Sequence, residues 1–186
     1  MAITMLFGGA RSGKSALAVE LGVRHGGPVT YIATATAIDD DMSARIIRHR
    51  QERPAEWNTI EEEVDLKAAL AATADDSLAI IDCLTLWTSN VIWQEHTDEA
   101  VLQLAIETSR AAAQRTASTI VISNEVGLGV HPETSLGRRY RDVLGRVNQC
   151  WAAAASQNLL LVAGQAIKLR DPLDLLLDAT SESPKD

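Results

Sequence analysis

The sequence predicts an α/β fold in which a central, mainly parallel β-sheet is flanked by helices. Three observations support this prediction. Short apolar runs recur along the chain without period-2 alternation, which is typical of strands buried on both faces. Longer segments with helical patterning separate these runs, as in parallel sheets. The chain has 186 residues, of which 46% are hydrophobic, so we expect one domain over residues 1–186 with a buried core.

Strands and helices are expected to alternate from the N-terminus onward. The first apolar run leads into a glycine-rich loop, and a helix begins where the glycines end. A second helix starts with three acidic residues and ends with arginines, which suits the helix dipole. The polar end, Thr180–Asp186, is expected to fray. The expected strands are Ile3–Phe7, Val29–Ala33, Leu78–Asp82, Thr119–Ser123 and Leu159–Ala163, and the expected helices are Lys14–His25, Asp39–Glu52, Val64–Ala72, Asp98–Thr116 and Ser135–Ala155.

The charge balance argues against some classes of function. The chain has 17 basic and 25 acidic side chains and a net charge of −8, so nucleic acid is not expected as its main partner. No apolar run approaches the roughly 20 residues needed to span a bilayer. The first residues lack the charged segment of a signal peptide. Cys83 and Cys150 have no metal-binding or redox spacing, and a reducing cytoplasm is the expected location.

The first apolar run leads directly into a phosphate-binding motif. The residues Gly8, Gly9, Ala10, Arg11, Ser12, Gly13, Lys14 and Ser15 match G-x-x-x-x-G-K-[ST], between an expected strand and an expected helix. Glycines let successive N–H groups point at one anion, and the helix directs its positive end at the same place. We expect Lys14 to reach the β- and γ-phosphates of a nucleotide and Ser15 to bind Mg²⁺. The alternative is a glycine-rich turn with an incidental lysine.

Asp82 ends the third apolar run, at the carboxyl tip of an expected buried strand. Open α/β sheets bind their ligands at that edge. In P-loop proteins an acid there holds Mg²⁺, so Asp82 is a candidate metal ligand together with Ser15. The alternative is that Asp82 caps a helix over Leu84–Trp93, and the two roles are compatible.

His49 lies on a strongly charged expected helix. At about 100° per residue, the side that carries His49 also carries Arg45, Ile46 and Arg53. Arginines around an imidazole favour its neutral, nucleophilic form, and they would neutralise a phosphoryl or nucleotidyl group attached to it. The alternative is a solvated charged helix on which His49 has no catalytic role.

These motifs belong to a longer series of segments that follow one another along almost the whole chain. They are Gly8–Ser15, Tyr31–Thr34, Asp39–Met42 with Arg45, Ile46 and His49, Arg53 and Pro54 with Trp57, Thr59 and Glu61, Asn124–Val130 with Pro132, and Gly145–Gln149. The series resembles the bifunctional adenosylcobinamide kinase / adenosylcobinamide-phosphate guanylyltransferase family of cobalamin biosynthesis. The resemblance implies a P-loop NTPase fold of the RecA-like class and a homotrimer.

The resemblance also implies two reactions on a corrinoid partner, with Mg²⁺ as cofactor. In the first, a γ-phosphoryl group passes from ATP or GTP to the aminopropanol hydroxyl of adenosylcobinamide. In the second, GMP from GTP is attached to the resulting phosphate. His49 matches the family's histidine that carries GMP covalently, and Lys14 is the catalytic lysine of the phosphate loop. Nucleotide contacts are implied for the loop Gly8–Ser15 and for Thr34, Ala35, Thr36, Arg50, Gln51, Glu52, Arg53, Glu61 and Asp82.

Two positions depart from some relatives in the resembled family. Asp82 stands where some have glutamate, which shortens the reach to metal or guanine. Arg48 stands where some have a second histidine, which leaves His49 as the candidate nucleophile on this helix. The loop Asn124–Val130 has two interpretations, a flexible turn or a loop near the nucleotide or corrinoid.

Three other functions fit part of the pattern. One is a P-loop small-molecule kinase in which His49 is merely structural. Another is a nucleotide-dependent regulatory switch, although the guanine-binding string N-K-x-D is absent from the sequence. The third is a RecA-like motor on DNA, against which the short chain and the lack of a basic stripe argue.

Overall fold

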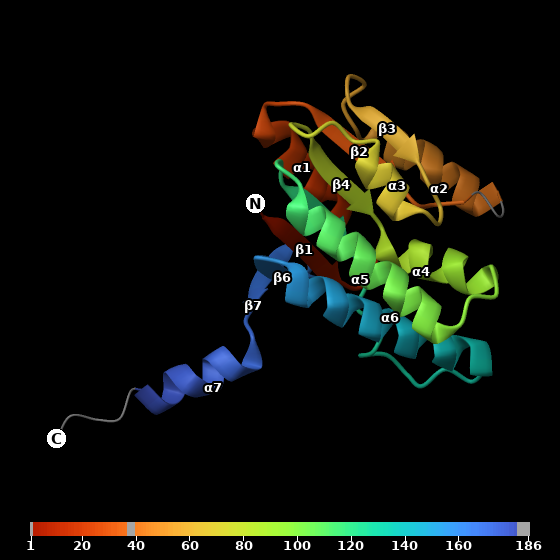
Figure 1. Ribbon diagram of the computed structural model, residues 1–186. Coiled ribbons are helices and arrows are strands. Elements are labelled where there is room, and N and C mark those ends of the chain that lie inside the picture. Colours follow the sequence, from red (N-terminus) through yellow and green to blue (C-terminus); the bar gives the residue numbers. More distant parts are fainter. Residues whose placement is uncertain (1, 37–39, 182–186) are drawn as a thin grey trace.

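A seven-stranded β-sheet forms the centre of the protein (Figure 1). The computed structural model describes residues 2–36 and 40–181, with the backbone alone at 41, 45 and 178–181. The strands lie in the order β3-β2-β4-β5-β1-β6-β7, and every pairing is parallel except that of β6 with β7. The mainly parallel sheet that the sequence predicts is therefore confirmed. The strands are β1 Ile3–Gly8, β2 Val29–Ala33, β3 Asn58–Glu61, β4 Leu78–Asp82, β5 Thr119–Ile122, β6 Gln157–Val162 and β7 Gln165–Leu169.

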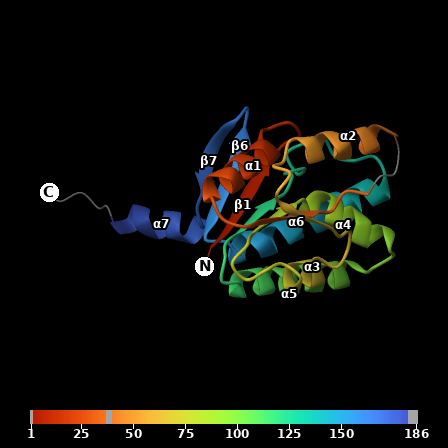
Figure 2. The same ribbon diagram turned by 90° about the horizontal axis from the view of Figure 1, so that it is seen from above.

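Helices cover both faces of this sheet. Helices α1 and α2 lie over one face, and α3, α4, α5 and α6 lie over the other (Figure 2). Helix α7 extends away from the rest of the protein in both views (Figures 1 and 2). Within the described ranges, no helix has both the length and the apolarity needed to cross a bilayer. The helices are α1 Lys14–His25, α2 Asp40–Gln51, α3 Leu66–Ala71, α4 Leu84–Trp93, α5 Asp98–Gln114, α6 Ser135–Ala154 and α7 Pro172–Ser181.

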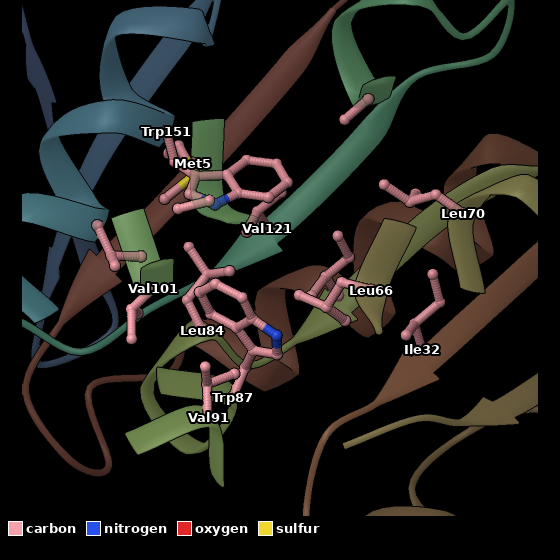
Figure 3. Packing of buried hydrophobic residues seen from close by; sticks show 14 of the residues in the cluster. Met5, Ile32, Leu66, Leu70, Leu84, Trp87, Val91, Val101, Val121 and Trp151 are labelled. Atoms are coloured by element: carbon pink, nitrogen blue, oxygen red, sulfur yellow. The ribbon is translucent and has the colours of Figure 1, made fainter. Parts of the chain in front are cut away.

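The larger hydrophobic cluster lies between the sheet and helices α3 to α6 (Figure 3). Met5 of β1 packs in it with Leu84 and Trp87 of α4 and Trp151 of α6, and none of the four is more than 1% exposed. Trp87 donates its indole N–H to the carbonyl of Val64 at 2.7 Å, so its polar edge is satisfied. Burying side chains of this size contributes about 1.5–3 kcal/mol each. This layer fixes the strands on whose ends the site is built.

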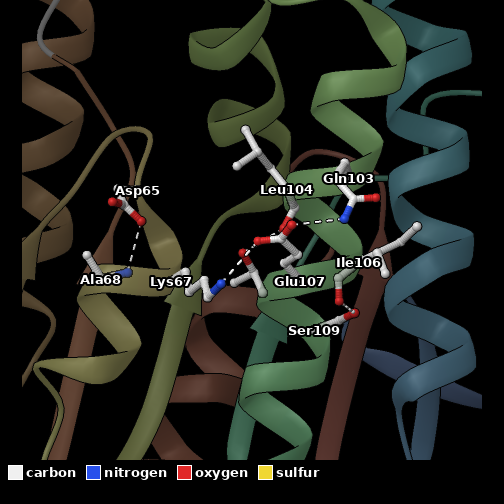
Figure 4. Close-up of polar contacts among 9 residues, drawn as sticks. Asp65, Lys67, Ala68, Gln103, Leu104, Ile106, Glu107 and Ser109 are labelled. Atoms are coloured by element: carbon white, nitrogen blue, oxygen red, sulfur yellow. Dashed lines mark hydrogen bonds and ion pairs between the residues drawn. The ribbon is translucent and has the colours of Figure 1, made fainter.

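Polar contacts join α3 to α5 on the outer surface (Figure 4). Asp65 caps α3 by accepting a hydrogen bond from the N–H of Ala68 at 2.9 Å. Lys67 donates to Glu107 at 3.0 Å, and Gln103 donates to the same carboxylate at 2.9 Å. An exposed ion pair of this kind contributes only about 0–1 kcal/mol. The position of α3 therefore depends mainly on its buried leucines.

Arg115 connects the end of α3 to the beginning of β4. Its guanidinium donates to the carbonyls of Leu70 (3.1 Å), Thr73 (3.3 Å), Ala74 (3.1 Å) and Ser77 (2.7 Å). These carbonyls lie in the last turn of α3 and in the loop that follows it, and those of Leu70 and Ala74 also accept backbone N–H groups. Arg115 thus fixes the entry into the strand that ends at Asp82.

The sequence pattern does not predict β3, β7 or α7. Every residue of β7 is exposed, as are most of β3, so neither strand shows an apolar run. Ser123 lies just beyond β5. The helix considered over Leu84–Trp93 is present as α4, and its N-cap is Cys83, not Asp82. Asp39, expected to begin the second helix, and residues 182–186 of the expected frayed end lie outside the described residues.

Candidate functional site

The loop between β1 and α1 is folded around the amino group of Lys14. Nζ of Lys14 donates hydrogen bonds to the carbonyls of Gly8 (2.9 Å) and Gly9 (2.7 Å), and the residue is 6% exposed. Gly8, Arg11 and Gly13 have positive φ angles of 148°, 58° and 101°. Such angles curl the backbone so that consecutive N–H groups face one side. The loop therefore has the form of a phosphate cradle, with the N-terminus of α1 at its end.

A turn near the edge of the sheet supports this cradle. Gly164, between β6 and β7, donates its N–H to the carbonyl of Ser12 at 3.0 Å. Its φ of 76° turns the backbone there, and its Cα lies 3.5 Å from where a Cβ would stand on Gly13. The β6–β7 hairpin thus packs against the phosphate loop and supports its backbone.

Asp82 ends β4 at the carboxyl edge of the sheet, as the sequence predicts. Its Oδ2 accepts a hydrogen bond from the hydroxyl of Tyr31 and lies 3.9 Å from Nδ1 of His49. The side chains of His49 and Asp82 are 27% and 13% exposed, so water screens their interaction only in part. Strand β5 alone separates β4 from β1, so one strand lies between Asp82 and the strand that leads into the phosphate loop.

A cavity of about 530 Å³ opens beside the His49–Asp82 pair. Its wall is built from α2, from β3 and from the ends of β2 and β4. Met42 and Ile46 add apolar surface to this wall, and Tyr31 and Glu63 also line it. A cavity at this edge of an α/β sheet is the expected place for a ligand. The predicted nucleotide contacts that line it are Ala35, Thr36, His49, Arg50, Arg53, Glu61 and Asp82.

The other predicted contacts lie outside this cavity. The loop Gly8–Ser15 is not part of its wall. Gln51 lines a neighbouring hollow of about 780 Å³, and Glu52 is exposed and lines neither. Thr34 is fully buried, and its hydroxyl donates to the carbonyl of Cys83 at 2.8 Å and accepts from its N–H at 2.7 Å. The Thr34 side chain therefore joins the ends of β2 and β4 instead of facing the cavity.

Two arginines contribute positive charge to the cavity wall. Arg50 forms an ion pair with Glu61, and both side chains are more than half exposed. Arg53 instead places its guanidinium carbon 3.6 Å from the centroid of the Tyr31 ring. Its Nε and Nη1 are buried and have no hydrogen-bond partner among the described residues. Leaving buried donors unpaired costs free energy, so these are groups that a bound ligand would satisfy.

Burial controls the proton affinity of two groups beside Asp82. Burial raises the pKa of Tyr31 well above its usual range, and the neighbouring Asp82 adds to the rise. Burial, together with the charge of Asp82, raises the pKa of the Cys83 thiol to about 11. Tyr31 therefore acts as a hydrogen-bond donor at neutral pH, and Cys83 is not a thiolate nucleophile. His49 is the residue of this wall that the sequence predicts as the nucleophile.

The residues predicted to hold Mg²⁺ have suitable donor atoms. Ser15 presents a hydroxyl in the first turn of α1, and Asp82 presents a carboxylate on the same edge of the sheet. Mg²⁺ in phosphoryl-transfer sites takes one or two protein oxygens and completes its coordination with phosphates and water. Among the described residues, no group of three or more histidine, cysteine or acidic side chains forms a full metal site. The pair therefore fits Mg²⁺ that arrives with a nucleotide.

Tyr31 is a site residue to which sequence reasoning assigns no role. It stands inside the apolar run Val29–Ala33, where an aromatic side chain is expected to be part of the core. The available signal is its polar tip, because a buried tyrosine hydroxyl requires a partner. Its partner, Asp82, is 51 residues away in sequence, and only the pairing of β2 with β4 brings the two together.

Solved structures resemble this fold. One is the flagellar accessory protein FlaH from Methanocaldococcus jannaschii, with a TM-score of 0.51, 16% identity, and coverage of 92% of this chain and 79% of that one. Another is an ATPase from the type III secretion system of pathogenic bacteria, with a TM-score of 0.53, 11% identity, and coverage of 96% and 61%. At such identities the likeness concerns the fold alone. Together with the strand order and the phosphate loop, it confirms the predicted P-loop NTPase fold of the RecA-like class.

Sequence relatives extend this likeness beyond the fold. The bifunctional adenosylcobalamin biosynthesis protein CobU of Escherichia coli is 37% identical over 179 residues, which cover 89% of this chain and 98% of that protein. The corresponding protein CobP of Pseudomonas aeruginosa is 39% identical over 177 residues, covering 91% and 98%. The family model for cobinamide kinase / cobinamide phosphate guanyltransferase matches residues 4–169, a range that contains the phosphate loop, His49 and Asp82. The chain therefore belongs to the CobU family of cobinamide kinases / cobinamide phosphate guanyltransferases.

Proposed function

We propose that this protein is a bifunctional enzyme of cobalamin biosynthesis that phosphorylates adenosylcobinamide and then attaches GMP to the new phosphate. Membership of the CobU family supports both activities. The observation that carries the second one is the position of His49, which lines a cavity at the carboxyl edge of the sheet and faces Asp82 at 3.9 Å. A nucleophile at this place has a use in nucleotidyl transfer and none in a simple kinase.

In the kinase step, the corrinoid hydroxyl attacks the γ-phosphorus of ATP or GTP, and the bond from that phosphorus to the β–γ bridging oxygen breaks. The hydroxyl gives its proton to solvent as the new phosphorus–oxygen bond forms, and the nucleoside diphosphate departs. Lys14 and the backbone N–H groups of the cradle hold the β- and γ-phosphates and offset their charge. Mg²⁺, held by Ser15 and Asp82, supplies further charge neutralisation when bound.

In the guanylyl step, an imidazole nitrogen of His49 attacks the α-phosphorus of GTP. A phosphorus–nitrogen bond forms, the bond to the pyrophosphate oxygen breaks, and pyrophosphate leaves. The corrinoid phosphate then attacks the same phosphorus and releases His49. With Nδ1 turned toward Asp82, Nε2 is the attacking atom, and the carboxylate stabilises the positive charge that develops on the ring. Two successive displacements at phosphorus give overall retention of configuration.

The guanylyl step must bridge the separation between the phosphate cradle and the cavity that contains His49. The phosphate loop does not line the cavity that contains His49, and β5 lies between the two strands that carry them. A triphosphate held by Lys14 must therefore extend toward α2, or α2 must move toward the loop. We propose that nucleotide binding brings His49 and the α-phosphorus together, as the family resemblance implies. Structures with and without GTP provide the comparison that tests this movement.

A labelling experiment tests the two roles. The protein is incubated with α-labelled GTP and Mg²⁺ and then denatured, and the attached label is tested for lability to acid and stability to base. We expect such an adduct in the wild-type protein, its loss in His49→Ala, and its retention in His25→Ala, which removes a histidine at the end of α1. We expect Lys14→Ala to depress both reactions. A folded His49→Ala protein that has also lost kinase activity would contradict this division of roles.

The homotrimer implied by the resemblance stays a prediction. Leu173, Leu176 and Leu177 of α7 are 67%, 65% and 67% exposed, and the helix extends away from the sheet (Figure 1). Contacts between subunits typically cover apolar surface of this kind. The single domain, the cytoplasmic location and the lack of a nucleic-acid partner also stay predictions.

A further inference from the structure

Tyr31 touches two charged side chains of the cavity wall. The residue is 1% exposed and donates its hydroxyl proton to Oδ2 of Asp82, the oxygen that lies 3.9 Å from Nδ1 of His49. On the face of its ring, the guanidinium of Arg53 stacks at 3.6 Å from the centroid. Tyr31 therefore contacts Asp82, the partner of the proposed nucleophile, through its hydroxyl, and it contacts the positively charged Arg53 through the face of its ring.

The hydroxyl of Tyr31 restricts the carboxylate of Asp82. The strand register pairs Tyr31 with Ile80 and Ala33 with Asp82, so Tyr31 reaches the carboxylate diagonally across β2 and β4. A carboxylate at the end of a strand rotates freely unless an oxygen is held, and the tyrosine hydroxyl holds Oδ2. A fixed carboxylate keeps its negative charge on the Nδ1 side of His49, which leaves Nε2 for attack and stabilises the positive charge that develops on the ring.

The aromatic ring of Tyr31 restricts the side chain of Arg53. A long arginine side chain loses rotamer freedom when it is ordered, and contact with the face of a buried ring achieves that ordering before a ligand arrives. The Nε and Nη1 of Arg53 are buried without a partner among the described residues, and the residue lines the cavity. Guanidinium N–H groups pair best with anionic oxygens. Beside a proposed acceptor of GMP, the fitting ligand is a phosphate oxygen of the nucleotide.

We propose that Tyr31 is a positioning residue of guanylyl transfer, which orients Asp82 toward His49 through its hydroxyl and presents Arg53 to the α-phosphate of GTP through its ring. The inference rests on the proposed function, because it needs the attack of His49 on that phosphate. Tyr31 forms no bond to nucleotide or corrinoid. The step that it supports forms the bond from the α-phosphorus to the nitrogen of His49 and breaks the bond to pyrophosphate.

The first experiment isolates the hydroxyl with Tyr31→Phe. Formation of the GMP adduct is followed in a single turnover at increasing GTP concentrations. We expect the maximal rate to fall about tenfold, the usual effect of losing a hydrogen bond to a charged group. The GTP concentration that gives half of this rate should stay unchanged, because the phenyl ring still carries Arg53. In an Asp82→Ala background, Tyr31→Phe should cause no further loss, since the group on which the hydroxyl acts is gone.

The second experiment isolates the ring. Pentafluorophenylalanine placed at position 31 keeps the shape of phenylalanine and reverses the charge distribution of the ring face, so it removes the attraction for Arg53 with little change in packing. GTP binding is measured by isothermal titration calorimetry in a His49→Ala background, where no adduct forms. Relative to phenylalanine, we expect the fluorinated ring to weaken binding about fivefold. With Arg53→Ala added, the two rings should bind GTP equally.

Melting temperatures of the variants check that each one is folded. An adduct rate of Tyr31→Phe equal to that of the wild type, or a loss that persists without Asp82, overturns the hydroxyl half of the inference. Equal GTP affinity of the phenylalanine and fluorinated variants overturns the ring half. A wild-type protein that forms no adduct overturns the proposed function instead. In that case the binding comparison, made without the nucleophile, still decides the role of the ring.

Discussion

Gly8 is the position at which the phosphate cradle tolerates a side chain least. Its φ is 148°, a conformation that strains any residue with a Cβ. A Cβ there would stand 2.4 Å from the carbonyl oxygen of Leu161 and 2.6 Å from Oγ of Ser12. The Ser12 hydroxyl can rotate away, but the carbonyl cannot, because β1 pairs Gly8 with Leu161 in the sheet. Gly8→Ala must therefore displace the beginning of the loop.

The magnitude follows from these two effects. A strained backbone angle costs about 1–3 kcal/mol, and overpacking costs about as much again, so we expect Gly8→Ala to lower the free energy of unfolding by about 2–6 kcal/mol. At about 2–4 °C per kcal/mol for a chain of this length, the Tm should fall by about 4–24 °C. Calorimetry of the nucleotide-free protein measures the shift.

Gly9→Ala is the matched control for this substitution. Nothing lies within 4 Å of a Cβ placed on Gly9, and the residue is exposed. We expect its Tm to stay within about 2 °C of the wild type, as for most surface substitutions. A Gly8→Ala protein that melts as close to the wild type as this control would refute the reasoning, because it would show that the cradle relaxes without cost.

Three further outcomes are expected. Arg115→Met should lower the free energy of unfolding in urea by about 3 kcal/mol, because four hydrogen bonds from a charged group are lost, and Arg115→Lys should lower it less. Burial raises the pKa of Tyr140, so the folded protein holds that proton more tightly than the unfolded chain. Stability should therefore fall as the pH rises above about 10, and urea titrations of Tyr140→Phe should show a shallower fall. Leu176→Ser should lower the molar mass measured by light scattering if α7 joins subunits, and an unchanged oligomer mass would contradict that use of the helix.

The strands that carry the site could be predicted because a strand buried on both faces appears in the sequence as an unbroken apolar run. β5 is buried at every residue and β1 at all but one, so their apolar runs are unbroken. β7 shows no such apolar run, since all of its residues are exposed. Its pairing with β6 depends on the turn at Ala163 and Gly164, whose φ angles are 51° and 76°. A turn with a non-glycine residue in that conformation is not readable from an apolar pattern.

The residues of the site also fall into those that the sequence predicts and those that it does not. Lys14 and the glycines around it form a contiguous string, and Asp82 is marked by its place at the end of an apolar run. Tyr31 and Arg115 have equally definite contacts, but their partners lie 38 to 51 residues away. Strand register and helix packing decide those contacts, and neither is encoded in a short string. Sequence patterns therefore locate the groups that do chemistry more readily than the groups that hold them.

Two reactions at one triphosphate-binding site require two directions of approach. The cradle around Lys14 holds the β- and γ-phosphates, so the α-phosphorus must lie toward one side and the transferable γ-phosphoryl group toward another. The loop after β5 lies directly against the cradle, since Glu125 donates its N–H to the carbonyl of Gly8 at 3.3 Å. His49 lies beside Asp82, one strand further along the sheet. We therefore expect the corrinoid hydroxyl to approach from the loop after β5 and His49 to approach from α2. Separate approaches explain why His49→Ala should abolish only the second reaction while Lys14→Ala depresses both.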